Sequence, residues 1–334
     1  RGFLGAIMQA HAQDPNSVLI TRGNFNNQLG VPLTLMRLNA SIEVAVLELG
    51  ASAVGDIQTL GNWSRPHIGC VLNARDAHLE TFGSFANIVR GKGELIDCVS
   101  MNGTVVLPAE DPALSIWSTQ VDSRDLWTFG RHAGDVRFTP KTDRLVEFET
   151  PLGRAEVTLP TIGLHFMENA SAAIAMAMAA DADLDSCVRG LSEAVIEPGR
   201  MTPLRGLTGH LVIDDTYNAS PQAVRAAIDW LATQAGDRLL ILGGLAELGD
   251  ASETLMAELG RYASHAGIEH LVTCGTGDAI GRDVTSVRHF ESVEALCDAL
   301  PELPAAAVTL VKGSRSAQMD RVIDALTGRR GGLH

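Results

Sequence analysis

The sequence has little positive charge for its size. Its 334 residues include 26 Lys and Arg but 40 Asp and Glu, which gives a formal net charge of −14. This balance argues against non-specific binding to DNA or to an anionic membrane, because both require a positive protein surface. A net negative charge does not exclude a local basic pocket that binds phosphate groups. We therefore expect no nucleic-acid partner.

Cysteines and long apolar runs are also scarce. The five cysteines are widely spaced and form no C-x-x-C pair, which argues against a disulfide framework or a zinc site. The longest run of small apolar residues, 170–180, is too short and too rich in alanine to span a bilayer. No signal-peptide pattern is visible. We expect a cytoplasmic protein without membrane insertion.

The first residues show a helical pattern that lacks a start signal. Phe3, Leu4, Ile7 and Met8 share one helical face, and the residue before this pattern is Arg1. A helix start normally carries a capping residue that satisfies its free N–H groups. We therefore expect the chain to begin inside a helix, with an upstream segment that this sequence does not contain.

The first half of the chain mixes element types. The apolar runs 44–49 and 68–73 are typical of buried strands, and helical patterns cover 84–98 and 169–180. Between them, 103–160 contains short alternating stretches that predict antiparallel strands.

The second half is regular, because strand-like runs alternate with helical ones. The expected strands are 211–214, 239–242, 270–273 and 308–311, and the expected helices are 221–234, 252–265, 293–300 and 316–326. This alternation predicts a parallel sheet in a doubly wound α/β domain. The stretch 197–200 is the best candidate for a linker between the halves.

Three polar residues of the first half stand out. Glu48 ends an apolar strand and His78 follows the next strand, so the two side chains could meet at the carboxyl edge of a sheet and hold a divalent ion. Each could equally be an ordinary strand-end acid or a loop histidine in solvent. Lys92 lies between two glycines in an expected helix, where each glycine costs about 1 kcal/mol relative to alanine. Close backbone approach would explain this, as would a surface lysine on a weak helix.

Two clusters of the second half carry opposite charges. Asp214 and Asp215 end an apolar strand, where acids can bind ribose hydroxyls. The following Ser220 and Pro221 also make a good helix start, which is the structural alternative. The run 312–316, K-G-S-R-S, occupies a strand-to-helix junction that directs N–H groups toward anions. It indicates a carboxylate or phosphate ligand, although helix capping would account for its serines.

In this order, the clusters resemble those of the Mur ligases over nearly the whole chain. The shared segments are G-N-F-N-N-Q-L-G-V-P at 23–32, E-L-G-A at 48–51, A-H-L-E at 77–80, K-G-E at 92–94, G-L-H at 163–165 with Asn169, P-G-R at 198–200, D-D-T-Y-N-A-S-P at 214–221, A-E-L-G at 246–249 and K-G-S-R-S at 312–316. The D-D-T-Y-N-A and K-G-S-R-S segments resemble those of the branch that adds D-alanyl-D-alanine.

The resemblance implies a fold and a reaction. Residues 1–197 would form most of a central ATP-binding domain, and 198–334 a C-terminal Rossmann-like ligase domain. The reaction implied is ATP- and Mg²⁺-dependent. The γ-phosphate activates the carboxylate of a UDP-N-acetylmuramoyl-tripeptide as an acyl phosphate, and the amine of D-alanyl-D-alanine then attacks. The protein would be a bacterial monomer that acts in peptidoglycan synthesis in the cytoplasm.

The resemblance also implies roles for single residues. Glu48, His78 and a carbamylated Lys92 would form the metal site. Residues expected to contact ATP are Asn27, Asn169, Arg200, Asp215, Tyr217 and Asn218. The substrate side would be lined by Lys312, Ser314 and Arg315. The residues expected to take part most directly in catalysis are His78, Lys92, Arg200, Lys312 and Arg315.

Four features depart from the family pattern. The phosphate-binding loop G-x-x-G-K-[ST] is absent, and we expect this chain alone to lack turnover. Phe166 occupies the place of an asparagine, Gly244 that of an aspartate, and Gln28 that of another aspartate. Two alternatives therefore stay open: a non-catalytic nucleotide-binding fragment, or a related amide ligase such as a folylpolyglutamate synthase.

Overall fold

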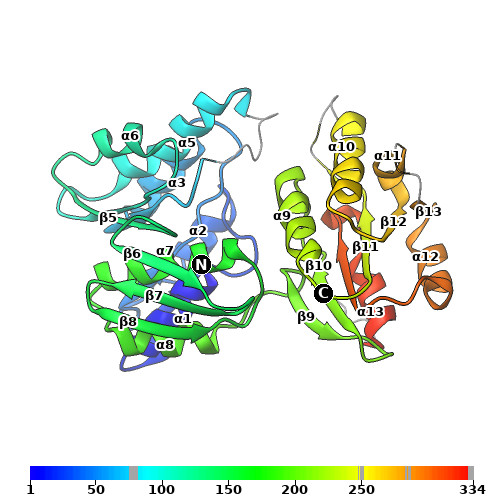
Figure 1. The fold of residues 1–334 in the computed structure, drawn as a ribbon. Helices are drawn as coiled ribbons and strands as arrows, with labels where there is room; N and C mark the ends of the chain where they lie inside the picture. Colours follow the sequence, from blue (N-terminus) through cyan, green and yellow to red (C-terminus); the bar gives the residue numbers. More distant parts are fainter. Residues whose placement is uncertain (75–81, 247, 249–251, 283, 285–286, 330–334) are drawn as a thin grey trace. The chain divides into compact units, whose positions relative to one another are not determined.

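The computed structural model describes residues 1–74, 82–246, 248, 252–282, 284 and 287–329 (Figure 1). The chain forms two compact units, Arg1–Val195 and Ile196–His334. The boundary between them lies between Val195 and Ile196, just before the expected linker at 197–200. Each unit has its own sheet and its own helices.

A six-stranded sheet forms the centre of the first unit. Its strands follow the order β3-β4-β5-β6-β7-β8, and their bounds are β3 (Ile68–Cys70), β4 (Thr104–Pro108), β5 (Asp125–Gly130), β6 (Val136–Pro140), β7 (Leu145–Thr150) and β8 (Gly153–Thr158). Neighbours from β3 to β6 are parallel, and only the pairs β6–β7 and β7–β8 are antiparallel.

The expectation of antiparallel strands throughout 103–160 is therefore wrong for the first part of this region. Every residue of β4 is buried, which is typical of a parallel strand covered on both faces. In β7 burial alternates from one residue to the next, as in an antiparallel strand with one face on the core. The alternating pattern correctly indicated β7 but does not describe β4.

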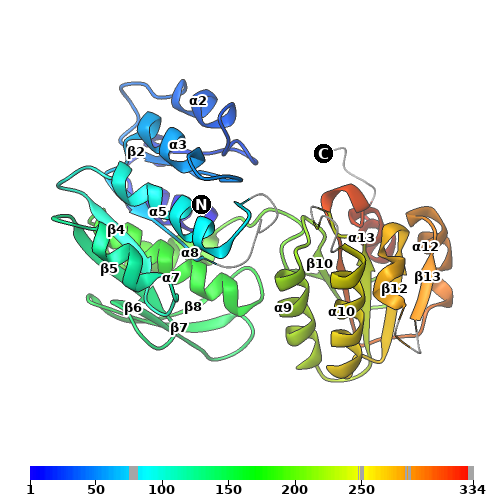
Figure 2. The ribbon, with the colours of Figure 1, turned by 90° about the horizontal axis from the view of Figure 1, so that it is seen from above.

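Helices cover the sheet of the first unit (Figure 2). The alanine-rich α7 (Leu164–Ala179) contacts β3 through β6, and α1 (Gly2–His11) packs on α7 and on α8 (Leu184–Glu193). Helices α5 (Phe85–Cys98) and α6 (Leu114–Trp117) pack on β3 and β4, and α3 (Asp56–Ser64) packs on α5. Ser84 caps α5, so the expected start of this helix is confirmed.

A small parallel pair lies beside this sheet in the same unit. It consists of β1 (Val18–Ile20) and β2 (Val44–Val46), with the short helix α2 (Gly30–Leu35) between them in the chain. Strand β2 ends at Val46, three residues earlier than expected. Glu48 therefore lies in the segment just after the strand.

The second unit is doubly wound, which confirms the expected fold class. Its sheet has the order β13-β12-β11-β14-β10-β9, with β9 (Thr202–Arg205), β10 (Leu211–Asp215), β11 (Arg238–Gly243), β12 (His270–Cys274), β13 (Val287–Phe290) and β14 (Val308–Lys312). All neighbours are parallel except β9 and β10. Strand β13 was not expected from the sequence.

Helices line both faces of this sheet (Figures 1 and 2). Helices α9 (Pro221–Ala232), α10 (Ser252–His265) and α11 (Asp278–Gly281) form one layer, and α12 (Val293–Ala299) and α13 (Asp320–Thr327) form the other. The chain leaves β11 toward α10 and β14 toward α13, which lie on opposite faces. The carboxyl ends of β11 and β14 are therefore a topological switch point, the usual place for a ligand in such sheets.

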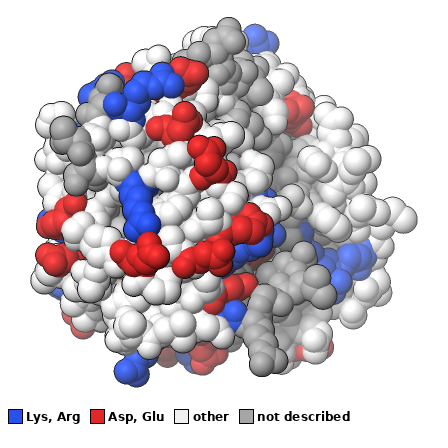
Figure 3. Space-filling model, turned by 90° about the vertical axis from the view of Figure 1, so that its right-hand side faces the viewer, with Lys and Arg blue, Asp and Glu red and all other residues white. Residues whose placement is uncertain are grey.

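Acidic and basic side chains are intermingled on the face shown in Figure 3. Exposed ion pairs such as Arg288–Glu302 and Lys141–Glu147, each 3.0 Å apart, are screened by water and add little stability. Among the described residues, no helix has the length and apolar character needed to cross a membrane.

Candidate functional site

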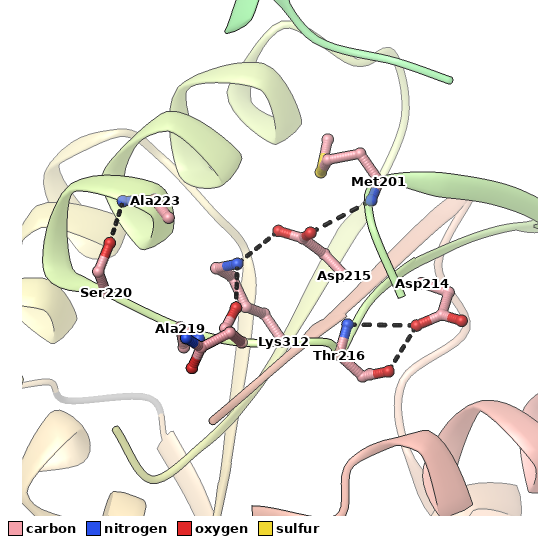
Figure 4. A network of polar contacts seen from close by, with 9 residues as sticks. Met201, Asp214, Asp215, Thr216, Ala219, Ser220, Ala223 and Lys312 are labelled. Atoms are coloured by element: carbon pink, nitrogen blue, oxygen red, sulfur yellow. Dashed lines mark hydrogen bonds and ion pairs between the residues drawn. The ribbon is translucent and has the colours of Figure 1, made fainter. Parts of the chain in front are cut away.

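Two opposite charges meet at the carboxyl edge of the second sheet. Asp215 ends β10 and Lys312 ends β14, and the two residues are in register on neighbouring parallel strands. The Lys312 ammonium lies 2.7 Å from Asp215 Oδ2 and donates a second hydrogen bond of 2.9 Å to the Asn218 carbonyl (Figure 4). The expected acidic and cationic clusters thus join in one network.

Asp214 points away from this ion pair. One of its carboxylate oxygens accepts hydrogen bonds from the Thr216 hydroxyl at 2.7 Å and the Thr216 N–H at 3.2 Å. Burial raises the pKa of the Asp214 carboxyl, because a charged carboxylate is poorly solvated there. Asp214 therefore shapes the turn after β10, whereas Asp215 is the acid that meets the cation.

The segment 199–201 closes onto the same turn. The Tyr217 N–H donates to the Gly199 carbonyl at 2.9 Å, and the Met201 N–H donates to Asp215 Oδ1 at 3.2 Å. Gly199 has φ +79°, and a Cβ there would lie 2.7 Å from the Tyr217 nitrogen, so only glycine fits. The Arg200 guanidinium stacks 4.0 Å from the centre of the Tyr217 ring.

The K-G-S-R-S segment divides into inward and outward side chains. Ser314 is buried, and both its N–H and its hydroxyl donate to the Gly244 carbonyl, at 3.0 and 2.8 Å. Arg315 is 62% exposed and lies 3.8 Å from Asp320. The expected helix from residue 316 is wrong at its start, because Gln318 has φ +51° and α13 begins only at Asp320.

In the first unit, Glu48 has neighbours that the sequence analysis missed. The Asn26 amide donates to Glu48 Oε1 at 2.8 Å, and Arg1 Nε lies 3.5 Å from Glu48 Oε2. The Lys92 ammonium donates to the Asn73 carbonyl at 2.8 Å, just beyond β3. Asn26 belongs to the quoted G-N-F-N-N segment, which is the signal that could have identified it.

The expected metal site lies partly outside the described residues. His78, one of its three expected members, is not among them. In the described part of the chain, no group of three or more His, Cys, Asp and Glu side chains could hold a metal ion. The metal-ligand roles stay predictions.

The two asparagines expected to contact ATP occupy different settings. Asn27 is exposed, and its side-chain oxygen accepts the N–H groups of Leu29 at 3.1 Å and Gly30 at 2.9 Å at the start of α2. This is a capping interaction that stabilises the helix start. Asn169 is half-buried on α7. Their contacts with nucleotide also stay predictions.

Two family models match this chain, one within each unit. The model described as the Mur ligase middle domain matches residues 3–177, and the model described as the Mur ligase, glutamate ligase domain matches 199–315. The chain belongs to the Mur ligase family.

Several Mur ligases resemble this chain closely. The UDP-N-acetylmuramoyl-tripeptide–D-alanyl-D-alanine ligase of Escherichia coli K12 is 38% identical over 320 residues, which cover 93% of this chain and 71% of the relative. A crystal structure of MurF from Acinetobacter baumannii has a TM-score of 0.88 at 32% identity, covering 98% of this chain and 73% of that one. MurF from Thermotoga maritima in complex with ADP has a TM-score of 0.84 at 26% identity, covering 97% and 76%.

The folylpolyglutamate synthase alternative receives less support. The match to folylpolyglutamate synthase from Thermotoga maritima covers 99% of this chain and 86% of that enzyme's chain. Its TM-score is 0.72, but the identity is only 14%. This likeness shows a shared Mur ligase fold and nothing about the substrate.

The structure shows which residues surround the three substitutions that depart from the Mur ligase pattern. Phe166 is buried, and its ring packs edge-on against Phe3, with centroids 6.5 Å apart. At Gly244, a Cβ would lie 1.9 Å from Thr276 Oγ1, so an aspartate does not fit beside this threonine. Gln28 makes a long contact of 3.4 Å with Asp56.

Proposed function

We propose that this protein joins D-alanyl-D-alanine to the terminal carboxylate of a UDP-N-acetylmuramoyl-tripeptide, with ATP as the energy source. The observation that carries the proposal is the 38% identity, over 93% of the chain, to the Escherichia coli enzyme of that name. A carboxylate oxygen attacks the γ-phosphorus and ADP leaves. The dipeptide amine then attacks the acyl carbon, loses a proton and expels phosphate.

We propose that the turn after β10 receives the nucleotide. Asp215 lies at the carboxyl edge of the sheet, where its remaining lone pairs can accept ribose hydroxyls. The Arg200–Tyr217 stack supplies a cation and an aromatic face side by side. Asn218 is exposed in the same turn, and Asn27 and Asn169 are proposed contacts from the first unit.

We propose that Glu48 contributes to a magnesium site. Its carboxylate is 40% exposed and follows β2, which fits the preference of Mg²⁺ for one or two carboxylates together with phosphates and water. His78 and a carbamylated Lys92 are the other proposed members. Bound Mg²⁺ would neutralise charge on the phosphates, and Glu48 would fix its place.

On the acceptor side we propose Ser314 and Arg315. Arg315 is the exposed cation of the K-G-S-R-S segment and suits a carboxylate, for which its planar guanidinium offers two parallel N–H groups. Ser314 holds this segment against Gly244. We further propose that the protein acts as a cytoplasmic monomer, a setting in which five unpaired cysteines are stable.

Phosphate release tests the reaction directly. In a protein that carries this chain together with the phosphate-binding loop, we expect release only when ATP, UDP-N-acetylmuramoyl-tripeptide and D-alanyl-D-alanine are all present. Arg200→Lys keeps the charge but loses the planar stack on Tyr217, so the KM for ATP should rise about tenfold. Release that continues without the dipeptide would sink the proposed function.

A nucleotide-binding protein without turnover is the alternative that the sequence left open. Calorimetry with ADP and ATP separates the two candidates. Nucleotide binding without any phosphate release favours the second, whereas dipeptide-dependent release favours the ligase.

A further inference from the structure

The chain buries one of its three lysines. Lys312 has a side chain that is only 3% exposed, whereas Lys92 is half-buried and Lys141 is exposed. Removing an ammonium group from water is costly unless it is paired and hydrogen-bonded. The buried position of Lys312 is therefore explained by its two hydrogen-bond partners, Asp215 and the Asn218 carbonyl.

Both hydrogen bonds of the ammonium group go to residues of the second unit, to which Lys312 itself belongs. Its two hydrogen bonds, of 2.7 and 2.9 Å, end on the last residue of β10 and on the turn that follows it (Figure 4). These two hydrogen bonds and the burial of the side chain leave the ammonium group little access to a substrate carboxylate. Arg315, three residues later, is the exposed cation of this segment. Direct contact with the dipeptide is therefore a better role for Arg315 than for Lys312.

The effect of Lys312 extends through Asp215 to the segment before β9. Asp215 bonds Lys312 through Oδ2 and the Met201 N–H through Oδ1. The neighbouring Tyr217 N–H bonds the Gly199 carbonyl. Lys312 thus fixes the carboxylate that joins the turn after β10 to residues 199–201.

We propose that Lys312 is a positioning residue for the nucleotide. It holds Asp215 and the Asn218 carbonyl in place for the ribose and the base, and it does not touch the dipeptide. This inference rests on the proposed function, because it assumes that Asp215 faces a nucleotide. It replaces the expectation that Lys312 contacts the incoming amine substrate.

The test is a double-mutant cycle on ADP binding, measured by calorimetry. The variants are Lys312→Met, Asp215→Asn and the two together. Lys141→Met is the matched control, because it removes an exposed lysine that is paired with Glu147. Each single change at the site should weaken ADP binding about 10- to 100-fold, the effect of losing a charged hydrogen bond. The double variant should bind like Asp215→Asn alone, and Lys141→Met like the unchanged protein.

The double variant also guards against misfolding, since it removes both buried charges together. If the two losses multiply in the double variant, Lys312 acts independently of Asp215 and the inference is wrong. Amide exchange at Met201 and Tyr217 gives a measure that needs no ligand. It should accelerate in Lys312→Met and stay unchanged in Lys141→Met; equal protection in both variants would overturn the inference.

Steady-state kinetics separate this inference from the proposed function. In Lys312→Met the KM for ATP should rise while the KM for D-alanyl-D-alanine stays within about twofold. A selective rise in the KM for the dipeptide would contradict the positioning role but leave the ligase proposal intact. Failure of the unchanged protein to bind ADP would instead remove the proposed function, and the inference with it.

Discussion

Gly244 offers a sharp test of how the second unit is packed. It follows β11, and Thr276 follows the neighbouring strand β12. A Cβ on residue 244 would lie 1.9 Å from Thr276 Oγ1, 3.1 Å from its Cβ and 3.3 Å from its carbonyl carbon. Ordinary contacts of such atoms exceed about 3.5 Å, so Gly244→Ala forces a neighbour to move.

Two features limit how the structure can relax. Thr276 can rotate its hydroxyl away, but its Cβ and backbone stay close. The backbone of Gly244 cannot retreat freely either, because its carbonyl accepts two hydrogen bonds from Ser314. Overpacking of this kind costs about 1–3 kcal/mol. In a Thr276→Ala background the shortest contact is gone, and the cost of Gly244→Ala should fall below about 1 kcal/mol.

Urea unfolding measures this cycle, with fluorotryptophan NMR as the readout. Trp230 is the only one of the four tryptophans in the second unit, so its signal follows that unit. An equal cost of Gly244→Ala with and without Thr276 would refute the steric explanation.

Two further predictions concern stability. The hydrogen-bonded ion pair with Arg238 lowers the pKa of Glu269 to about 2, so its contribution is present above the usual value of 4.5 and is lost as the pH falls toward 2. Glu269→Gln should remove this pH dependence and, after solvent screening, about 1 kcal/mol at neutral pH, as measured by urea unfolding between pH 2 and 7. Glu94 accepts two N–H groups from the start of α3. Glu94→Ala should destabilise the first unit by about 1 kcal/mol, seen as a lower urea midpoint for the Trp63 signal, and an unchanged midpoint would show that this cap contributes nothing.

Local patterns were enough to predict most elements of the second unit. The strand runs, the serine and proline at the start of α9, and the polar residues at strand ends are all properties of neighbours in the chain. Ser220 caps α9 through the Ala223 N–H, as the sequence indicated. The pattern of 103–160 predicted strands but not the parallel pairing of β4, and β13 was not predicted, because burial by distant elements decides such strands.

What the sequence alone determined is therefore most of the elements and the chemical types where they end: acids at the end of β10, cations at the end of β14 and glycines at the end of β11. Only the tertiary structure decided which of these meet. The sheet places β14 between β10 and β11, so Lys312 pairs with Asp215, 97 residues earlier, and Ser314 bonds Gly244. Strand order depends on how helices cover both faces of the sheet, and no local pattern in the chain contains that information.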